Sequence, residues 1–361
     1  MYEQAGAMAL RFLPEAGHVE PYGGGHINDT YRVTLPDGAR YVLQRLNTAI
    51  FTRPEQVMEN IAAVTAHLKA VILREGGDAQ RGTLTFLSAR DGSLLERDGE
   101  GGVWRMMRFI EGACSVDLPD TPALFELSGR AFGRFQRQMD GFDAARLHET
   151  IPGFHDTPAR FAQLEAAASR DAMGRAAGCA AELAFCRARE KEAGRLLEAL
   201  SRGEIPLRVT HNDTKLNNVL LDEKTGEGVC VIDLDTVMPG LTAYDFGDAI
   251  RTGASTAAED EPDLSKVGFS MTMFEAFARG YLGEAGAMLT AQEIASLPLG
   301  AWTMTFECGM RFLADHLSGD TYFKIARPGH NLDRARTQFA LCAQMEARME
   351  EMACAVAKQS G

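Results

Sequence analysis

One short polar segment constrains this chain more than any other feature. Residues 211–218 read His-Asn-Asp-Thr-Lys-Leu-Asn-Asn, and two apolar runs, Val219–Leu221 and Val229–Ile232, follow it. The stretch between those runs is rich in turn-forming residues, so the pair predicts a β-hairpin. Such a hairpin would bring Asp233, at the end of the second run, back beside Asn218. The polar segment and the returning aspartate therefore predict one clustered site.

The residue types in this cluster suit phosphoryl transfer. That chemistry needs a carboxylate to orient the attacking hydroxyl and accept its proton, a cation beside the γ-phosphate, and oxygen ligands for Mg²⁺. Asp213 is the candidate base and Lys215 the candidate cation, while Asn218 and Asp233 are the candidate metal ligands. The alternative is a polar loop with buried caps. Four such residues in this order, ending on a buried strand, favour catalysis with ATP and Mg²⁺ as cofactors.

Two further aspartates follow Asp233 along the chain. Asp235 is a candidate second metal ligand, with a substrate contact and a purely structural role as the alternatives. Asp245 begins a literal Asp-Phe-Gly triplet, but it lies well past the end of the expected hairpin strand. We therefore assign the metal to Asp233. We expect Asp245 to accept backbone N–H bonds and to brace the polar loop.

The N-terminal part of the chain predicts an antiparallel sheet with one helix. Strands are expected at Val19–Tyr22, Thr30–Leu35 and Tyr41–Leu46, a helix over Pro54–Ile72, and strands at Gly82–Leu87 and Val103–Phe109. This order is typical of an α+β fold rather than of alternating β/α units.

From Pro122 onward the pattern is mainly helical. Helices are expected over Leu124–Met139, Pro158–Ala168, Ala180–Leu200, Ser265–Leu282, Ala291–Leu313 and Leu332–Lys358. A strand-rich island, Leu207–Asp235, interrupts them and carries the polar segment. Glu111-Gly112 is the natural boundary. It predicts an N-terminal nucleotide-binding lobe at residues 1–111 and a C-terminal catalytic and substrate-binding lobe at residues 112–361.

The polar segment resembles known catalytic loops. His211–Asn218 is similar to the H-R-D-L-x-x-x-N loop of protein kinases, and Asp233 is similar to the aspartate of their D-F-G motif. The His-x-Asp form with I-D-L-D resembles the aminoglycoside phosphotransferase and choline kinase superfamily. Within it, the run HNDTKLNNVLLD…CVIDLDTVMPG…YDFGDAIR resembles the N-acetylhexosamine 1-kinases. The resemblance covers nearly the whole chain and is looser outside residues 211–251.

This resemblance implies a protein-kinase-like bilobal fold and an ATP- and Mg²⁺-dependent kinase. Its implied substrate is N-acetylglucosamine or N-acetylgalactosamine, phosphorylated at the anomeric hydroxyl, with no preference indicated between the two. Asp213 would contact that hydroxyl, and Thr236, Arg311 and Tyr322 become candidate sugar contacts. The polar helix stripe that contains Arg311 has a second interpretation as a solvated face. The interval between Asp233 and Asp245 has no room for a kinase activation segment, which disfavours a protein substrate.

Two regions of the N-terminal part are candidates for holding the nucleotide. The triplet Gly23-Gly24-Gly25 lies between the first two expected strands, and glycine lets the backbone approach phosphates closely. His26 and Asn28 in the same loop are candidate sugar contacts, with turn capping as the alternative. Phe109 and Ile110 belong to the expected hinge, which would hold the adenine mainly through backbone groups.

The strand position where kinases carry the lysine of V-A-I-K departs from the kinase pattern. Gln44 matches that lysine, or Arg45 does if the register slips by one residue. Strand alternation puts these two side chains on opposite faces, so only one of them can contact the phosphates. Glu59 on the following helix is the expected ion-pair partner, with Glu55 as the second choice. A solvated helix carboxylate is the alternative for both.

Charge and cysteine content narrow the range of partners. The net charge of −13 disfavours nucleic acid and anionic membranes. No stretch approaches the ~18 consecutive apolar residues of a membrane span, and the N-terminus lacks the pattern of a secretory signal. The seven cysteines are odd in number and form no C-x-x-C pair. This favours a reducing cytoplasm over a disulfide framework or a zinc site. The partner that the resemblance implies, a small-molecule substrate, is consistent with this charge and cysteine content.

Three other functions compete with a sugar kinase. A kinase of another small alcohol or amine, such as homoserine, choline or an aminoglycoside, would share the fold and the catalytic residues. A pseudokinase-like binding module is disfavoured because Asp213, Asn218 and Asp233 occur together. A hydrolase of sulfated mucin sugars is expected to carry a C-x-P-x-R motif, which this sequence lacks.

Overall fold

The computed structural model describes residues 2–23 and 27–359. Contacts divide the chain into two compact units. Unit 1 comprises Met1–Cys114, Gly141–Ile151 and Leu220–Met238, and unit 2 comprises Ser115–Asp140, Pro152–Val219 and Pro239–Gly361. The chain therefore passes between the units more than once. The functional lobes expected at residues 1–111 and 112–361 stay a prediction, because this division rests on contacts alone.

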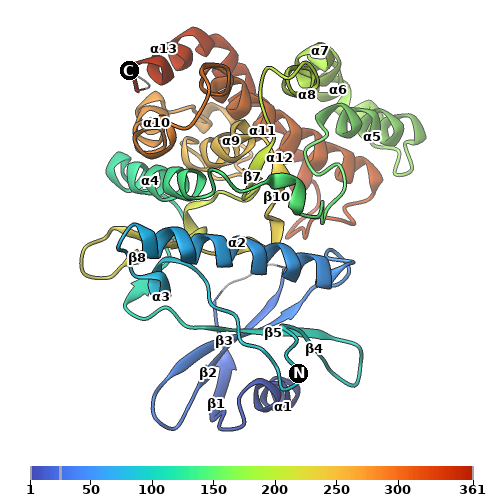
Figure 1. Cartoon of the computed structure of the whole chain (residues 1–361). Coiled ribbons are helices and arrows are strands. Elements are labelled where there is room, and N and C mark those ends of the chain that lie inside the picture. Colours follow the sequence, from blue (N-terminus) through green and yellow to red (C-terminus); the bar gives the residue numbers. More distant parts are fainter. Residues whose placement is uncertain (1, 24–26, 360–361) are drawn as a thin grey trace. The chain divides into compact units, whose positions relative to one another are not determined.

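Unit 1 contains a five-stranded antiparallel sheet with the strand order β1-β2-β3-β5-β4 (Figure 1). Its strands are β1 (His18–Pro21), β2 (Asp29–Thr34), β3 (Arg40–Leu46), β4 (Glu96–Arg97) and β5 (Val103–Arg108). In this register Gln44 of β3 lies opposite Thr30 of β2 and Arg105 of β5. The first three expected strands and the strand at Val103–Phe109 are confirmed, with small shifts at their ends.

A helix that the sequence patterns do not indicate, α1 (Tyr2–Phe12), completes the core of this sheet. Its buried residues pack together with buried residues of β2, β3 and β5; the set includes Ala5, Met8, Ala9, Phe12, Val33, Leu43, Trp104 and Met106. Burial of apolar side chains at three- and four-residue steps explains why this segment is helical in its context.

The helix expected over Pro54–Ile72 is confirmed as α2 (Pro54–Arg74), with Pro54 in its first turn. The strand expected at Gly82–Leu87 is wrong. The structure has a short helix there, α3 (Ala79–Gly82), and only an isolated bridge between Phe86 and Met107. The side chain of Asp78 accepts a hydrogen bond from Gln80 N and so caps the first turn of α3.

A second sheet has the order β6-β8-β9, with β6 (Ala113–Cys114), β8 (Val219–Asp222) and β9 (Gly228–Val231). Strands β8 and β9 are the expected hairpin, and Asp222 N donates to Glu227 O at 2.8 Å to close its turn. Beyond β9, Asp233 has a left-handed backbone conformation, with φ of 58°. The 3₁₀ turn η4 (Leu234–Thr236) follows directly.

Unit 2 is mainly helical (Figure 1). Its helices are α4 (Pro122–Gln138), α5 (Thr157–Arg170), α6 (Ala180–Arg187), α7 (Glu190–Ala193), α8 (Arg195–Ser201), α9 (Thr242–Gly253), α10 (Met271–Ala285), α11 (Ala291–Ser318), α12 (His330–Ala347) and α13 (Met349–Gln359). Two short strands, β7 (Arg208–Thr210) and β10 (Met238–Gly240), pair with each other. None of the helices in the described part of the chain combines the length and apolar character needed to cross a membrane.

Three of the expected C-terminal helices are wrong in their extent. The segment Ser265–Leu282 is helical only from Met271, where α10 begins after the 3₁₀ turn η5 (Leu264–Lys266), and the side chain of Ser270 accepts from Met273 N as its N-cap. The segment Ala180–Leu200 forms three helices, and Gly194 separates α7 from α8, where glycine lowers helix stability. The segment Leu332–Lys358 forms α12 and α13, which are separated at Arg348. Helix α9, which contains the Asp-Phe-Gly triplet, lies outside all of the expected helices.

Helix α9 approaches α11 closely because both helices have a glycine at the contact. A Cβ atom on Gly247 would lie 2.3 Å from Gly300 O, and one on Gly300 would lie 2.2 Å from Ala243 O. Both distances are far below a van der Waals contact, so each position accepts only glycine without a shift of the backbone. This contact fixes the helix that carries Asp245 and Asp248.

We predict that Gly247→Ala lowers the free energy of unfolding by about 1–3 kcal/mol, the usual cost of forcing extra atoms into a packed core. Gly283→Ala in α10 is the matched control, since a Cβ there has nothing within 4 Å. Alanine favours a helix over glycine by up to ~1 kcal/mol, so the control should be neutral or stabilising. Thermal denaturation of both variants tests this, and equal melting temperatures would contradict the close packing of α9 on α11.

Candidate active site

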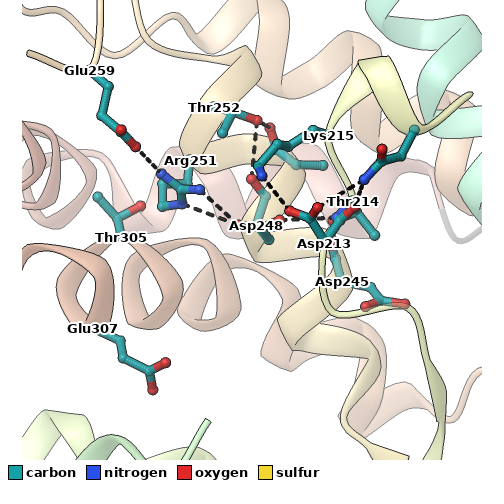
Figure 2. Close-up of polar contacts among 12 residues, drawn as sticks. Asp213, Thr214, Lys215, Asp245, Asp248, Arg251, Thr252, Glu259, Thr305 and Glu307 are labelled. Carbon is teal, nitrogen blue, oxygen red and sulfur yellow. Dashed lines mark hydrogen bonds and ion pairs between the residues drawn. The ribbon is translucent and has the colours of Figure 1, made fainter. Parts of the chain in front are cut away.

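The expected catalytic loop lies between β7 and the 3₁₀ turn η3 (Leu216–Asn218) in unit 2. Asp213 Oδ1 accepts from Lys215 Nζ at 2.6 Å, and Asp213 Oδ2 accepts from Asn218 Nδ2 at 2.9 Å. Asn218 Nδ2 also donates to Asp213 O at 2.8 Å. The structure therefore brings together the three candidate residues of this loop: the base, the cation and one metal ligand. Figure 2 shows the contact between Asp213 and Lys215.

These contacts keep Asp213 ionised. Burial alone would raise the pKa of its carboxyl, but the charge of Lys215 and the hydrogen bond from Asn218 outweigh burial and hold that pKa below its usual range. Burial likewise opposes the charge on Lys215, whereas Asp213 and Asp248 favour it and raise the pKa of the ammonium. The stabilisation from an ionised Asp213 is thus complete above the unfolded pKa of ~3.9 and is lost as the pH falls through the folded value.

Asp245 braces the loop, as the sequence predicts. Its carboxylate accepts from His211 N at 2.9 Å, from Asn212 N at 2.8 Å and from Gln136 Nε2 at 2.8 Å. Asn212 has a positive φ of 63°, a conformation that is costly outside glycine and that these bonds hold in place. Burial raises the pKa of Asp245 above its usual range despite these donors.

A second carboxylate of α9, Asp248, supports the same loop and was not expected. Asp248 Oδ2 accepts from Thr214 N at 3.0 Å, while Oδ1 accepts from the Arg251 Nε and Nη2 atoms at 3.1 Å each. Arg251 Nη1 in turn donates to Glu259 Oε1 at 2.8 Å (Figure 2). The spacing of Asp245, Asp248 and Arg251, at three-residue steps, is the sequence signal that could have revealed both the helix and its buried polar face.

Asp235 forms buried contacts in unit 1. Its Oδ1 accepts from Arg105 Nη1 at 2.5 Å, and its Oδ2 accepts from Asn28 Nδ2 at 2.7 Å. Both carboxylate oxygens of Asp235 therefore accept hydrogen bonds, as the structural role weighed for it requires, and metal ligation by Asp235 stays a prediction. Asp233 is exposed, and its role as a metal ligand stays a prediction. Thr236 lies in the same turn, η4, and is partly buried.

Gln44 and Arg45 lie on opposite faces of β3, as expected. Gln44 Oε1 accepts from Arg105 at 2.7 and 3.0 Å, which places it on the face that carries Asp235. Arg45 lies over the ring of Trp104, with its guanidinium carbon 6.0 Å from the ring centroid. Arg105 is the functional candidate that the sequence patterns missed.

The expected ion pair between β3 and helix α2 is wrong. Glu59 pairs with His148 at 2.6 Å, and Glu55 pairs with Arg97. Both glutamates are more than half exposed, so they lie on the outer face of α2 rather than toward Gln44. Any contact of Glu59 with a nucleotide stays a prediction.

Only some of the candidate nucleotide-binding residues lie in the part of the chain that the structure describes. Gly23 has a positive φ of 74°, which suits glycine, whereas Gly24, Gly25 and His26 lie outside the described residues. The neighbouring Tyr22 packs edge-on against Phe109 of the expected hinge, with ring centroids 5.6 Å apart. The next residue, Ile110, is buried. One end of the glycine-rich loop and the hinge therefore lie together in unit 1.

The structure brings the sugar-contact candidates Arg311 and Tyr322 together in unit 2. Arg311 Nη2 donates to Tyr322 Oη at 3.5 Å, and its guanidinium carbon lies 5.6–5.8 Å from the ring centroids of Phe154, Tyr322 and Phe323. Tyr322 is 61% exposed, so its ring is accessible to a ligand. Glu307, from the same helix, is instead buried against His155 and Thr157.

The oxygen donors present suit a divalent cation bound with a nucleotide. Within unit 2, Asn218 turns its Nδ2 atom to Asp213 and can present its amide oxygen to a cation; within unit 1, Asp233 is an exposed carboxylic acid. Amide and carboxylate oxygens are ligands that Mg²⁺ prefers, usually together with phosphates and water. Among the residues that the structure describes, no three His, Cys, Asp or Glu side chains cluster as a metal site. When bound, such an ion would neutralise charge on the phosphates.

Comparison with known proteins identifies the fold. The profile of the phosphotransferase enzyme family matches residues 18–288. A microcompartment-associated aminopropanol kinase matches 96% of this chain and 98% of its own, with a TM-score of 0.63 and 19% identity. Amicoumacin kinase, solved with AMP-PNP and Ca²⁺, matches 95% and 93%, with a TM-score of 0.59 and 15% identity. Choline kinase from Cryptosporidium parvum Iowa II matches 99% and 96%, with a TM-score of 0.57 and 11% identity. The protein-kinase-like bilobal fold expected from the sequence is confirmed.

We predict that Asp213→Asn folds normally but turns over about 10²–10⁴-fold more slowly, the usual contribution of a positioned general base. Asparagine keeps an oxygen for Lys215 and loses the charge that orients and finally accepts the proton. The measurement is steady-state ADP release at saturating acceptor, with the melting temperature as the control for folding. Turnover close to that of the wild type would remove Asp213 from the mechanism.

Asp245→Ala and Asp233→Ala should have opposite phenotypes. The first leaves the buried N–H groups of His211 and Asn212 without their acceptor, at about 1–3 kcal/mol each, and so lowers the melting temperature. The second removes an exposed carboxylate, so it should leave the melting temperature almost unchanged and abolish the Mg²⁺-dependent part of nucleotide binding. Thermal denaturation with and without Mg²⁺ and ADP measures both. Exchanged phenotypes would reverse the assignment of the two aspartates.

Proposed function

We propose that this chain, which belongs to the phosphotransferase enzyme family, transfers the γ-phosphoryl group of ATP to the anomeric hydroxyl of an N-acetylhexosamine. The coarser part of this statement, a small-molecule phosphotransferase of the aminoglycoside and choline kinase type, follows from the family and the fold. The finer part, the acetamido sugar and its anomeric oxygen, is supported by the similarity of residues 211–251 to the N-acetylhexosamine 1-kinases.

The observation that carries the proposal is the ionised Asp213 between Lys215 and Asn218. A carboxylate with so low a pKa is too weak a base to deprotonate a sugar hydroxyl in advance. It instead orients the hydroxyl and accepts its proton late, which suits the loose transition state of phosphoryl transfer. Lys215 supplies the positive charge that a γ-phosphate needs. The nucleotide would be ATP and the cation Mg²⁺, in line with the AMP-PNP and Ca²⁺ bound to the similar amicoumacin kinase.

The anomeric hydroxyl fits this weak base better than the other hydroxyls of a hexose. The ring oxygen stabilises the anomeric oxyanion, so this hydroxyl is the most acidic one on the sugar. A late proton transfer to Asp213 is easier from a more acidic donor. The proposed product is therefore the sugar 1-phosphate.

A kinase of a small amino alcohol is the second candidate. Aminopropanol kinase and choline kinase are among the similar structures, and the net charge of −13 would attract a cationic substrate. Arg311 argues for the sugar instead, because its guanidinium would repel an ammonium group but would donate to the carbonyl of an acetamide. Tyr322 beside it offers an exposed aromatic face, a surface on which sugar rings pack well.

N-acetylglucosamine or N-acetylgalactosamine should be the best of the acceptors tested, and phosphorus NMR should show a 1-phosphate. Discrimination against glucose, galactose and glucosamine should reach about 10⁴-fold in kcat/KM if buried protein groups pair with the acetamide, since its loss would leave them unpaired. Recognition of its methyl group alone would give only about 10–200-fold.

The measurement is relative kcat/KM across hexosamines, amino alcohols and aminoglycosides. A 6-phosphate product would contradict the proposed acceptor atom. Faster phosphorylation of aminopropanol, choline, homoserine or kanamycin would contradict the proposed substrate class and leave the phosphotransferase assignment intact.

A further inference from the structure

Unit 1 has no lysine at the strand position where kinases hold the nucleotide phosphates. Gln44 stands there, and the helix glutamate expected to pair with a cation, Glu59, binds His148 instead. A lysine–glutamate pair of this kind normally has to be in place before a kinase is active. A chain that keeps the catalytic loop but lacks this pair needs another device that links the sheet to the metal-binding segment.

Arg105 lies directly opposite Gln44 in the sheet and is only 2% exposed. Its Nε and Nη2 atoms both donate to Gln44 Oε1, at 3.0 and 2.7 Å. Its Nη1 atom donates to Asp235 Oδ1 at 2.5 Å and lies 3.7 Å from Met58 Sδ on α2. The guanidinium therefore connects β3, β5 and α2 to the turn η4.

The burial of the Arg105–Asp235 ion pair bears on whether the pair serves only stability. The side chains of Arg105 and Asp235 are 2% and 4% exposed, so both charges have lost their water. The desolvation cost of such a pair commonly cancels its attraction, and well-packed apolar residues are often at least as stable. A stability role alone is thus a weak explanation for placing two charges there.

The pair fixes a segment whose backbone is under strain. Asp235 lies two residues after Asp233 in the chain. The backbone φ of Asp233 is 58°, which is unfavourable for a residue with a side chain. The other Asp235 oxygen accepts from Asn28 Nδ2 at 2.7 Å, and Asn28 Oδ1 accepts from Asn47 N at 2.9 Å. Asp235 therefore ties the turn after Asp233 both to the strand position of Gln44 and to the end of the glycine-rich loop.

We propose that the Arg105–Asp235 ion pair is the positioning device that holds Asp233 in its metal-binding conformation, in the place of a lysine–glutamate pair. Arg105 acts through Asp235 and does not touch the substrate, so it is a positioning residue. The inference rests on the nucleotide and Mg²⁺ part of the proposed function and is independent of the sugar. Groups that orient metal ligands typically contribute about 10–100-fold to metal affinity.

The test is a neutral replacement of both partners, Arg105→Met with Asp235→Asn. The asparagine can still accept from Asn28 Nδ2, and no unpaired charge is left in the core. Calorimetry should show metal-free ADP bound within about twofold of the wild type, and Mg²⁺-ADP bound about 10–100-fold more weakly. Mn²⁺ binding in the presence of ADP, followed by electron paramagnetic resonance, should weaken in parallel.

Arg105→Lys keeps the charge and covers the case in which the double variant fails to fold. Its ammonium lacks the fork that reaches Gln44 and Asp235 together, so Mg²⁺-ADP affinity should fall by about tenfold with little change in melting temperature. Arg97→Met is the matched control, because Arg97 forms an exposed ion pair with Glu55 in the same unit. It should bind like the wild type.

Wild-type affinity for Mg²⁺-ADP in the double variant or in Arg105→Lys would overturn the inference and leave the pair as a simple structural tie. One result from the wild-type protein itself would overturn the proposed function as well as this inference. If the wild-type protein binds ADP equally well with and without Mg²⁺, no metal is held for Asp233 to ligate. The wild-type titration thus separates the two failures.

Discussion

The buried carboxylate of Asp245 holds the loop that carries Asp213. It accepts two consecutive backbone N–H groups, from His211 and Asn212, and keeps Asn212 in a left-handed conformation. The helix that supplies it, α9, is itself fixed by a glycine-to-glycine approach to α11 that admits no Cβ atom. The position of the candidate base therefore depends on a chain of contacts that runs from helix packing to a single carboxylate.

The catalytic loop, its hairpin and the bracing role of Asp245 could be predicted from the sequence because their residue types and spacing are dictated by local chemistry. Helix α9 was not predicted, although Asp245, Asp248 and Arg251 recur in it at three-residue steps, because charged residues are rarely buried and every residue of this helix except Thr252 is buried. Arg105 was missed for a different reason. Strand alternation says which face a side chain occupies but not which residue lies across from it, and that depends on the pairing register.

The hydrogen bonds between Gln44 and Arg105 give a physical reason for a glutamine at the position of the kinase lysine. A glutamine amide cannot hold a phosphate by charge, but its oxygen accepts two donors of a buried guanidinium. The buried positive charge at this position thus lies on Arg105 of β5 and is neutralised by Asp235, two residues from the aspartate expected to bind metal. In unit 2 the ion pair of Lys215 with Asp213 is more exposed, as its proposed contact with the substrate requires. The proposals thus give the buried pair a positioning role and the more exposed pair a role in contacting the ligand.

Transfer of the phosphoryl group to the anomeric oxygen is tested most directly by isotope labelling. N-acetylglucosamine carrying ¹⁸O at C1 is incubated with the enzyme, Mg²⁺ and ATP, and the product is observed by phosphorus NMR. An attack by that oxygen places ¹⁸O in the bridge of the sugar phosphate, so its phosphorus signal should show the isotope shift. A sugar phosphate without the shift would mean that another hydroxyl attacks, and the absence of any sugar phosphate would contradict the proposed acceptor.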